Sequence, residues 1–273
     1  MPKYFVDVSV LQQEMVKLEG DTAHHLERVL RVRVGDEVIL GDNLGFDYHC
    51  RIESIKPLML RIEERKICLT ESSFPVTLYQ GVPKSQKLEL IIQKATELGV
   101  SKIVPVYTEH SVVKDKHNSG GGKLARLQKI AESAAGQSMR GFVPEVGGFM
   151  TWAEIFGEAR NDINSGICSD LYNEGTHKRL KIAAHEKEDK HTIKSVMERE
   201  ASEREASESN LSNLSNSSNS KSIDLWIGPE GGFSASEIDE MLKCGFHLVS
   251  LGPRILRTET AAIAALAQIM LMM

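Results

Sequence analysis

The chain has 273 residues, of which 33 are Lys or Arg and 38 are Asp or Glu, so its net charge is −5. This length suggests about two domains, and the 41% hydrophobic content is enough for a core. No apolar stretch reaches the roughly 18–20 residues of a membrane helix, and we expect a cytosolic protein without a signal peptide. The cysteines form no C-x-x-C pair, so no metal site is expected. The net charge alone argues against a nucleic-acid partner.

Residues 1–72 have the pattern of a small β-rich domain. Short runs of β-prone residues, such as 37–40, 48–52 and 58–62, are separated by turn residues such as Gly35-Asp36 and Gly41-Asp42-Asn43. One short helix is expected around residues 21–30. This pattern predicts a compact, barrel-like domain.

Residues 73–273 alternate between strand-like and helix-like segments. The expected strands cover 76–79, 102–106, 166–172, 223–227 and 246–250, and the expected helices cover 84–98, 123–139, a segment from Ser234, and 258 to the end. Ser234 and Glu237 have the spacing of a capping box. The alternation predicts an α/β domain with a largely parallel sheet.

The composition changes abruptly between about residues 186 and 222. The second half of this segment is almost entirely Ser, Asn and Glu. Such a sequence cannot bury enough apolar area to offset the entropy lost on ordering. We therefore predict a disordered insertion within the α/β domain, tolerated at the surface or, alternatively, serving as a partner-binding segment.

Two loops near the end of the chain follow expected strands and precede expected helices, where α/β sheets bind ligands. The first, Gly228–Gly232, is rich in glycine, so its backbone can approach a ligand closely, and its acidic Glu230 argues against a phosphate. The second, 251–261, surrounds Ile255 and Leu256 with arginines, which predicts a slot for a flat heterocycle, and Thr258 is a candidate cap of the last helix. The alternative for the first loop is an ordinary tight turn. The alternative for the second loop is a capped helix start with a buried Ile-Leu pair.

Both loops together are specific. GPEGGFS at 228–234 and LGPRILRTETA at 251–261 resemble the signature of the small-subunit ribosomal RNA methyltransferase E family, within the SPOUT superfamily. Further matches occur in the family's order at 25–31 with Gly35-Asp36, at KATELG (94–99) and around Gln137 (134–140). The resemblance covers the chain apart from the insertion.

The resemblance implies a PUA-like RNA-binding β-barrel domain (1–72) and a SPOUT domain (73–273) with a deep trefoil knot. It implies S-adenosylmethionine (SAM) as cofactor, a homodimer, and methylation of N3 of one uridine (bacterial position 1498) in 16S rRNA, within the assembled 30S subunit. The residues expected to bind SAM are Leu171, Gly228, Pro229, Glu230, Gly231, Gly232, Leu251, Gly252, Ile255, Leu256 and Thr258.

Uridine N3 carries a weakly acidic proton, so the enzyme must remove it or stabilise the anion that it leaves. We expect Arg257 to stabilise negative charge on the uracil, and Glu230 or Glu259 to be the candidate base. The alternative is that both glutamates are structural, one in a loop and one at a helix N-terminus.

The net charge conceals a basic stretch. Residues 84–140 contain ten Lys or Arg and five acids, an excess of +5. The residues expected to contact RNA are Lys3, Arg28, Arg31, Arg33, Lys84, Lys94, Gln137 and Arg140. Lys3 stands where the family tends to have Arg. Three other functions stay open: a non-catalytic RNA-binding or ribosome-assembly protein, a SPOUT enzyme that methylates another base or a ribose, and a nucleotide-phosphate-binding protein, which the missing Walker lysine disfavours.

Overall fold

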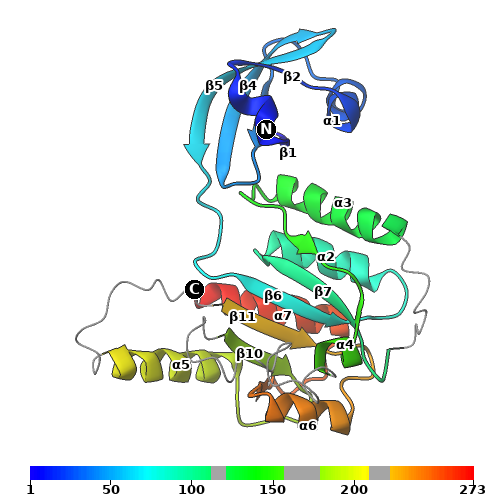
Figure 1. Cartoon of the computed structure of the whole chain (residues 1–273), viewed down its shortest axis with the longest axis vertical. Coiled ribbons are helices and arrows are strands. Elements are labelled where there is room, and N and C mark those ends of the chain that lie inside the picture. Colours follow the sequence, from blue (N-terminus) through cyan, green and yellow to red (C-terminus); the bar gives the residue numbers. More distant parts are fainter. Residues whose placement is uncertain (112–120, 157–178, 209–221) are drawn as a thin grey trace. The chain divides into compact units, whose positions relative to one another are not determined.

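The computed structural model describes residues 1–111, 121–156, 179–208 and 222–273 (Figure 1). The chain forms two compact units. The first contains Met1–Glu71 together with Lys129–Pro144, and the second contains Ser72–Gln128 together with Glu145–Met273. Each unit is therefore discontinuous in the sequence, whereas the sequence pattern predicts one uninterrupted segment for each domain.

The first unit is built on a five-stranded sheet in the order β1-β3-β4-β5-β2. Strand β1 runs parallel to β3, and the other neighbours are antiparallel. Alternate side chains of the long strands, such as Val38, Leu40, Ile52 and Leu60, form its core. The strands are β1 (Lys3–Phe5), β2 (Met15–Lys17), β3 (Glu37–Gly41), β4 (Phe46–Ile55) and β5 (Leu58–Ile67).

The helical segments of the first unit lie before β3 and after residue 128. A 3-10 turn (Val8–Gln12) precedes β2, and helix α1 (Gly20–His24) continues into a π-helical turn (His25–Leu30) that ends at Arg31, whose φ is 51°. This confirms the helix expected around residues 21–30. The C-terminal part of α3 (Gly121–Gln137) belongs to the same unit.

Buried charges join the two segments of the first unit. The Lys3 ammonium, whose side chain is fully buried, lies 2.5 Å from an Asp47 oxygen and donates to the carbonyl oxygen of Arg140. The Arg140 guanidinium, also buried, pairs with Glu71 at 2.6 Å. Gly136 fits closely here, since a Cβ at this position would lie 2.6 Å from the carbonyl oxygen of Lys3.

The second unit is an α/β domain, as predicted. Its sheet has the order β12-β10-β11-β6-β7-β8, with β9 also paired to β7, and the paired strands are parallel. The strands are β6 (Val76–Gly81), β7 (Lys102–Tyr107), β8 (Glu145–Val146), β9 (Met150–Thr151), β10 (Arg179–Ala184), β11 (Ser222–Ile227) and β12 (His247–Val249).

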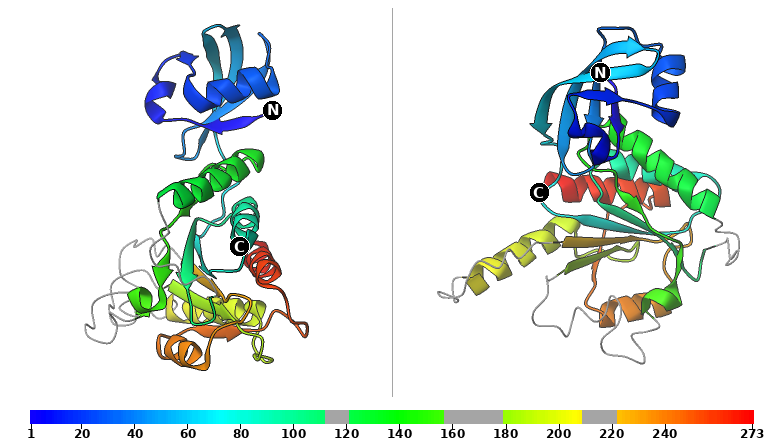
Figure 2. Two further views of the ribbon diagram at one scale, coloured as in Figure 1. Left: turned by 90° about the vertical axis from the view of Figure 1, so that its right-hand side faces the viewer. Right: turned by 45° about the horizontal axis from the view of Figure 1, so that its top comes forward.

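Helices cover both faces of this sheet (Figures 1 and 2). Helices α4 and α6 pack on an aromatic cluster in which Tyr79 and Trp226 stack at 4.4 Å between ring centroids. Helices α2 and α7 contact each other and lie on the opposite face. The helices are α2 (Lys87–Glu97), α4 (Trp152–Phe156), α5 (Ile193–Glu208), α6 (Ala235–Lys243) and α7 (Thr258–Leu271). None of the helices in the described part of the chain is both long and apolar enough to span a membrane.

The region before β11 differs from the expectation. The strand expected at 166–172 lies outside the described residues, and β10, which the sequence analysis missed, pairs with both β11 and β12. The prediction of disorder over 186–222 is wrong for α5. This helix presents Ile193, Val196 and Glu200 on one face, at i, i+3 and i+7, and all three are buried. Residues 209–221 lie outside the described part.

Candidate active site

The two glycine-bearing loops of the second unit lie at the carboxyl edge of its parallel sheet. Loop 228–232 follows β11, and loop 250–257 follows β12. Strand β6, next to β11 in the sheet, ends at Gly81 beside the first loop. Ligands of α/β domains bind at this edge, because the strand ends and helix starts leave backbone groups open there. The structure therefore brings the two predicted loops to one edge.

Close backbone packing explains the glycines around the first loop. A Cβ on Gly81 would lie 2.5 Å from Pro229 Cδ and 2.6 Å from its nitrogen. A Cβ on Gly228 would lie 3.0 Å from the backbone of Gly232, which itself has a φ of +67°. Side chains at Gly81 and Gly228 would collide with backbone atoms, and the positive φ of Gly232 favours glycine, so the loop packs closely against the end of β6.

A buried hydrogen-bonded chain links this loop to helix α7. The hydroxyl of Thr258 donates to the carbonyl oxygen of Gly228 at 2.6 Å, and Nε2 of Gln80 donates to the same hydroxyl at 3.0 Å. Thr258 is thus the first helical residue and not the cap, a position taken by Arg257 without a side-chain hydrogen bond. The Oε1 atom of the fully buried Gln80 has no hydrogen-bond partner among the described residues.

Lys87, in the first turn of α2, joins the two loops electrostatically. Its ammonium lies 3.1 Å from Glu230 in the first loop and 3.2 Å from Glu259 in the first turn of α7. Hydrogen bonds from this ammonium to Glu230 and then to Glu259 raise the pKa of Lys87. This role is not apparent from the sequence, because Lys87 and Lys94 both fit the polar face of an amphipathic helix. Its place just after a loop at the carboxyl edge was the available signal.

Glu230 is held as a carboxylate. Partial burial alone would raise its pKa, but hydrogen bonds from its own amide, from Lys87 and from the amide of Lys84 outweigh this effect and lower the pKa. The Lys84 amide lies 3.2 Å from both carboxylate oxygens. A carboxylate with a lowered pKa is a weaker proton acceptor than an unperturbed one.

The second loop is open to solvent. The side chain of Ile255 is 89% exposed, Leu256 is half-buried, and the Gly252 backbone has a φ of +109°. The alternative of a buried Ile-Leu pair is therefore wrong. The guanidinium of Arg257 is exposed and, within the described residues, forms no hydrogen bond or ion pair. Arg257 is thus a free cation at the start of α7.

His110, which follows β7, is a second neighbour of the first loop that the sequence analysis missed. Its Nδ1 atom lies 2.9 Å from the carbonyl oxygen of Gly231, so Nδ1 is the protonated donor. A Cβ on Gly231 would lie 2.8 Å from the Cβ of His110. The imidazole thus supports the loop from the side of β7. Leu171, expected to bind the cofactor, lies outside the described residues.

The residues expected to contact RNA fall into three groups. Lys3 and Arg140 are buried and ion-paired, so their side chains are not available to phosphates, and this part of the prediction is wrong. Lys94 is partly exposed and pairs with Glu97 at 2.8 Å. The exposed candidates are Arg28, Arg31, Arg33, Lys84 and Gln137.

Ion pairs also balance much of the basic stretch 84–140. Lys102 and Arg126 pair with Glu145 and Glu89, and Lys129 pairs with Asp21. The excess of +5 therefore does not form a single basic face in this part of the chain. Lys114 and Lys116 lie outside the described residues.

Comparisons with known proteins agree with the signature loops. A family model described as an RNA methyltransferase domain matches residues 70–270, and one described as an RNA methyltransferase PUA domain matches residues 18–63. Ribosomal RNA small subunit methyltransferase E of Bacillus subtilis is 30% identical over 280 residues, covering 98% of this chain and 96% of the relative. The chain belongs to this methyltransferase E family. The family expected from the sequence is thereby confirmed.

Solved structures of related enzymes have the same fold. Methyltransferase E from Neisseria gonorrhoeae, bound to S-adenosyl methionine, is 27% identical with a TM-score of 0.74, covering 100% of this chain and 98% of that one. A methyltransferase from Legionella pneumophila in complex with the bound cofactor SAM is 26% identical with a TM-score of 0.72, covering 97% and 95%. The family's α/β domain and small PUA-like β domain are therefore both present here.

Proposed function

We propose that this member of the methyltransferase E family transfers a methyl group from SAM to N3 of one uridine in 16S rRNA, the equivalent of bacterial position 1498. The observation that carries the proposal is the joining of both signature loops at the carboxyl edge by Lys87 and Thr258. The SAM-bound relatives and the RNA methyltransferase family models support a SAM-dependent rRNA methyltransferase.

The residues at this edge fit SAM. An adenine packs on apolar side chains, and exposed Ile255 and half-buried Leu256 are available for this beside the exposed Gly252. The carboxylate of Glu230 suits the hydroxyls or the positive charge of the cofactor. Residues Gly228 to Gly232, Leu251 and Thr258 complete the set from the two loops, and Leu171 remains a prediction. When bound, SAM supplies the electrophilic methyl group.

Arg257 is the residue that we assign to the chemistry. Its guanidinium is exposed and is not used by any carboxylate among the described residues. Such a cation stabilises the negative charge that uracil acquires as it loses the N3 proton. The stabilisation is strongest when the protein already holds the guanidinium next to the uracil before the proton leaves. Arg257 would thus lower the pKa of the uridine and hold the base in orientation.

Glu230 and Glu259 fit positioning roles better than the role of a base. Both carboxylates contact Lys87, and the lowered pKa of Glu230 weakens it as a proton acceptor. Their negative charges hold the cation that joins the two loops. The proton from N3 then leaves through Arg257-assisted ionisation to water.

A single assay tests the assignment. Purified protein and labelled SAM are incubated with small ribosomal subunits that lack the modification, and the methylated nucleotide is mapped. One methyl group on N3 of a uridine is expected, whereas a methyl group on a ribose or on another base would contradict the proposal.

Arg257→Ala should slow methyl transfer by about 10²–10³-fold, as loss of a charge-stabilising donor does, with SAM affinity retained. An unchanged rate would rule out this role.

We also propose that the substrate is the assembled 30S subunit and that the working unit is a homodimer. We further propose that the second unit contains the family's trefoil knot. A folded rRNA surface offers a shape that free RNA lacks, which favours the assembled particle. Exposed apolar side chains on the adjacent helices α2 and α7, Leu90 and Leu271, support a dimer on this side of the second unit. Light scattering during gel filtration would give the mass, and a monomer would contradict the dimer.

A further inference from the structure

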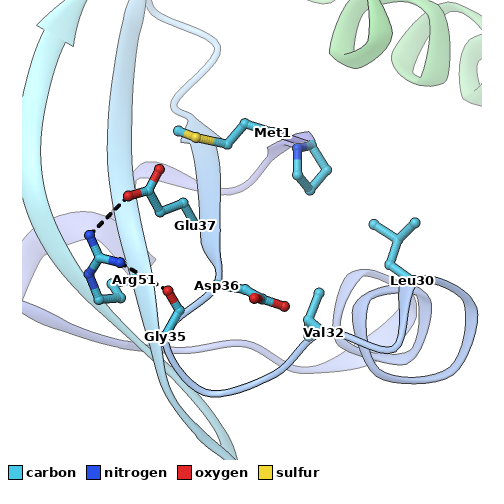
Figure 3. Close-up of a pocket in the computed structure, with 8 residues that line it drawn as sticks. Met1, Leu30, Val32, Gly35, Asp36, Glu37 and Arg51 are labelled. Atoms are coloured by element: carbon cyan, nitrogen blue, oxygen red, sulfur yellow. Dashed lines mark hydrogen bonds and ion pairs between the residues drawn. The ribbon is translucent and has the colours of Figure 1, made fainter.

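The first unit carries a hollow that the reaction chemistry does not use. It has a volume of about 490 Å³ and lies between Met1, the Leu30–Val32 segment and the turn at Gly35–Asp36 (Figure 3). Leu30 and Val32 form an apolar wall, and the carboxylate of Asp36 points toward Val32. Glu37 also lines the hollow and pairs with Arg51. A hollow with an apolar wall and a carboxylate acceptor suits a flat heterocycle with N–H donors.

Hydrogen bonds and ion pairs of Arg51 connect the residues at the floor of the hollow. Arg51 donates to the carbonyl oxygen of Gly35 at 2.9 Å and pairs with Glu37 at 2.9 Å and with Glu63 at 2.6 Å. One Asp36 oxygen accepts the amide of Arg33 at 2.7 Å. Arg51 is therefore fully engaged, whereas Asp36 keeps an oxygen available to a ligand.

The surface beside the hollow combines exposed apolar side chains with unpaired cations. Val29 is 60% exposed and Leu30 44%, which is unusual for side chains so close to each other in a small domain. The exposed side chains of Arg28, Arg31 and Arg33 form no ion pair among the described residues. Elsewhere in the same unit Arg61 pairs with Glu53 and Glu14.

Arg31 also occupies a backbone conformation that favours glycine. Its φ of 51° closes the π-helical turn, with its amide donating to Leu26. Glycine is the usual residue at such a helix end, because other side chains are strained there. Asn43, Ser85 and Met139 also have a positive φ, so the strain at Arg31 does not by itself identify a function. It makes Arg31→Gly a substitution that the backbone tolerates.

We propose that this hollow binds one unstacked nucleobase of the rRNA, a guanine by its N–H donors, while the arginines at 28, 31 and 33 bind the flanking phosphates. The base packs on Leu30 and Val32, and its N1 and N2 groups donate to Asp36. This inference rests on the proposed function for the identity of the RNA, and it extends that function by naming a recognition subsite on the first unit. Splayed bases on apolar or aromatic walls are a general mode of RNA recognition.

The test measures equilibrium binding of small ribosomal subunits lacking the modification, at several salt concentrations. Leu30→Ala should weaken binding about tenfold without changing the salt dependence, because the lost contact is apolar. Asp36→Asn should weaken binding to a similar degree. Arg31→Gly should lower the slope of log affinity against log salt by about 0.7, as loss of one phosphate contact does, and should not lower the melting temperature.

Leu44→Ala is the matched control, since Leu44 is 62% exposed in the same unit and does not line the hollow. Equal affinities for Leu30→Ala and Leu44→Ala would overturn the nucleobase site, as would a Leu30 effect that disappears at high salt. An unchanged salt slope for Arg31→Gly would overturn the phosphate contact. The binding experiment does not depend on methyl transfer. A wrong target base in the mapping assay would therefore refute the proposed reaction, whereas the effects of these substitutions on RNA binding would still test the nucleobase site.

Discussion

Lys87 shows how one side chain connects segments that are far apart in the sequence. It contacts the carboxylate of Glu230, in the loop before α6, and that of Glu259, in the first turn of α7. Without this cation the two carboxylates would repel each other, and the loops that carry them would lose their common anchor. Because the three side chains are between 14% and 30% exposed, the pairs stabilise the fold only weakly.

Lys87→Ala should therefore affect cofactor binding more than stability. We expect little change in the thermal unfolding midpoint, since solvent screens ion pairs that stay partly exposed. The SAM affinity should fall about tenfold, and Lys87→Arg should restore most of it. Titration calorimetry and thermal unfolding measure the two effects. Lys102→Ala, which removes an exposed pair with Glu145, is the control. Unchanged SAM affinity in Lys87→Ala would contradict the role.

The pKa of Glu230 predicts a pH dependence of stability. Its folded-state pKa is lowered from 4.5, so the folded protein binds this proton less readily than the unfolded chain does. The resulting stabilisation is complete above the unfolded-state value and is lost as the pH falls through the lower folded-state pKa. The stability difference between the wild type and Glu230→Gln, measured by urea unfolding, should be constant near neutral pH and shrink on acidification below 4.5. A constant difference down to pH values well below this would contradict the prediction.

At the scale of elements, the loops are shaped by backbone packing between β6 and the start of the 228–232 loop. Gly81 ends β6 against Pro229, and both residues belong to segments that carry the site. Stability and ligand binding therefore depend on the same close contact. A substitution here tests the architecture of the site without removing any charged group.

Gly81→Ala should destabilise the second unit by about 1–3 kcal/mol, the usual cost of inserting an atom into a closely packed region. The new Cβ would lie 2.5 Å from Pro229, and the backbone of the loop must move. Both the melting temperature and the SAM affinity should fall. Gly122→Ala, in helix α3 with open space around its Cβ, should leave both unchanged or raise the stability slightly. Equal behaviour of the two variants would show that Gly81 is not required.

Sequence patterns predicted the elements whose signals are local. Ser234 and Glu237 form the predicted capping box, with the Ser234 hydroxyl accepting from the Glu237 amide, because the motif spans only four consecutive residues. Helix α5 was missed because its polar composition conceals three buried positions, 193, 196 and 200. Strand β10 was missed because Lys181 interrupts its apolar pattern, although that residue is buried in the sheet.

The site was predictable in part for the same reason. The two loops follow strands and carry glycines, so their position at the carboxyl edge could be inferred from the chain. Lys87 and Gln80 could not be assigned, because the partners that connect them to Glu230 and Thr258 lie 143 and 178 residues away. The buried states of Lys3 and Arg140 depend on Asp47 and Glu71, and nothing near either residue in the sequence indicates burial.

On the scale of the whole molecule, the first unit depends on residues 129–144 as well as on the N-terminal segment. Lys3 joins the two segments, through Asp47 on one side and the carbonyl oxygen of Arg140 on the other. A buried cation of this kind is costly to remove, since its partner carboxylate is left without a counter-charge in a poorly solvated place.

Lys3→Ala should therefore lower the stability of the first unit by about 3–5 kcal/mol. Chemical denaturation followed by a probe in this unit measures the effect. Lys17→Ala, which removes an exposed pair with Glu19, should change stability by less than about 1 kcal/mol. A Lys3→Ala variant with normal stability and weakened RNA binding would instead restore the original expectation of a phosphate contact.

The two-segment construction of the first unit restricts how this enzyme could exchange its parts with a relative. A crossover near residue 72 would take Lys3, Asp47 and Glu71 from one parent and Arg140 from the other. The chimera would have to form the Arg140–Glu71 ion pair and the hydrogen bond from Lys3 to the Arg140 carbonyl oxygen between segments that were never selected together. A recombinant that inherits residues 129–144 with the N-terminal segment keeps these pairs intact. New RNA specificities in such a protein are thus expected to arise by point substitution more readily than by shuffling of domains.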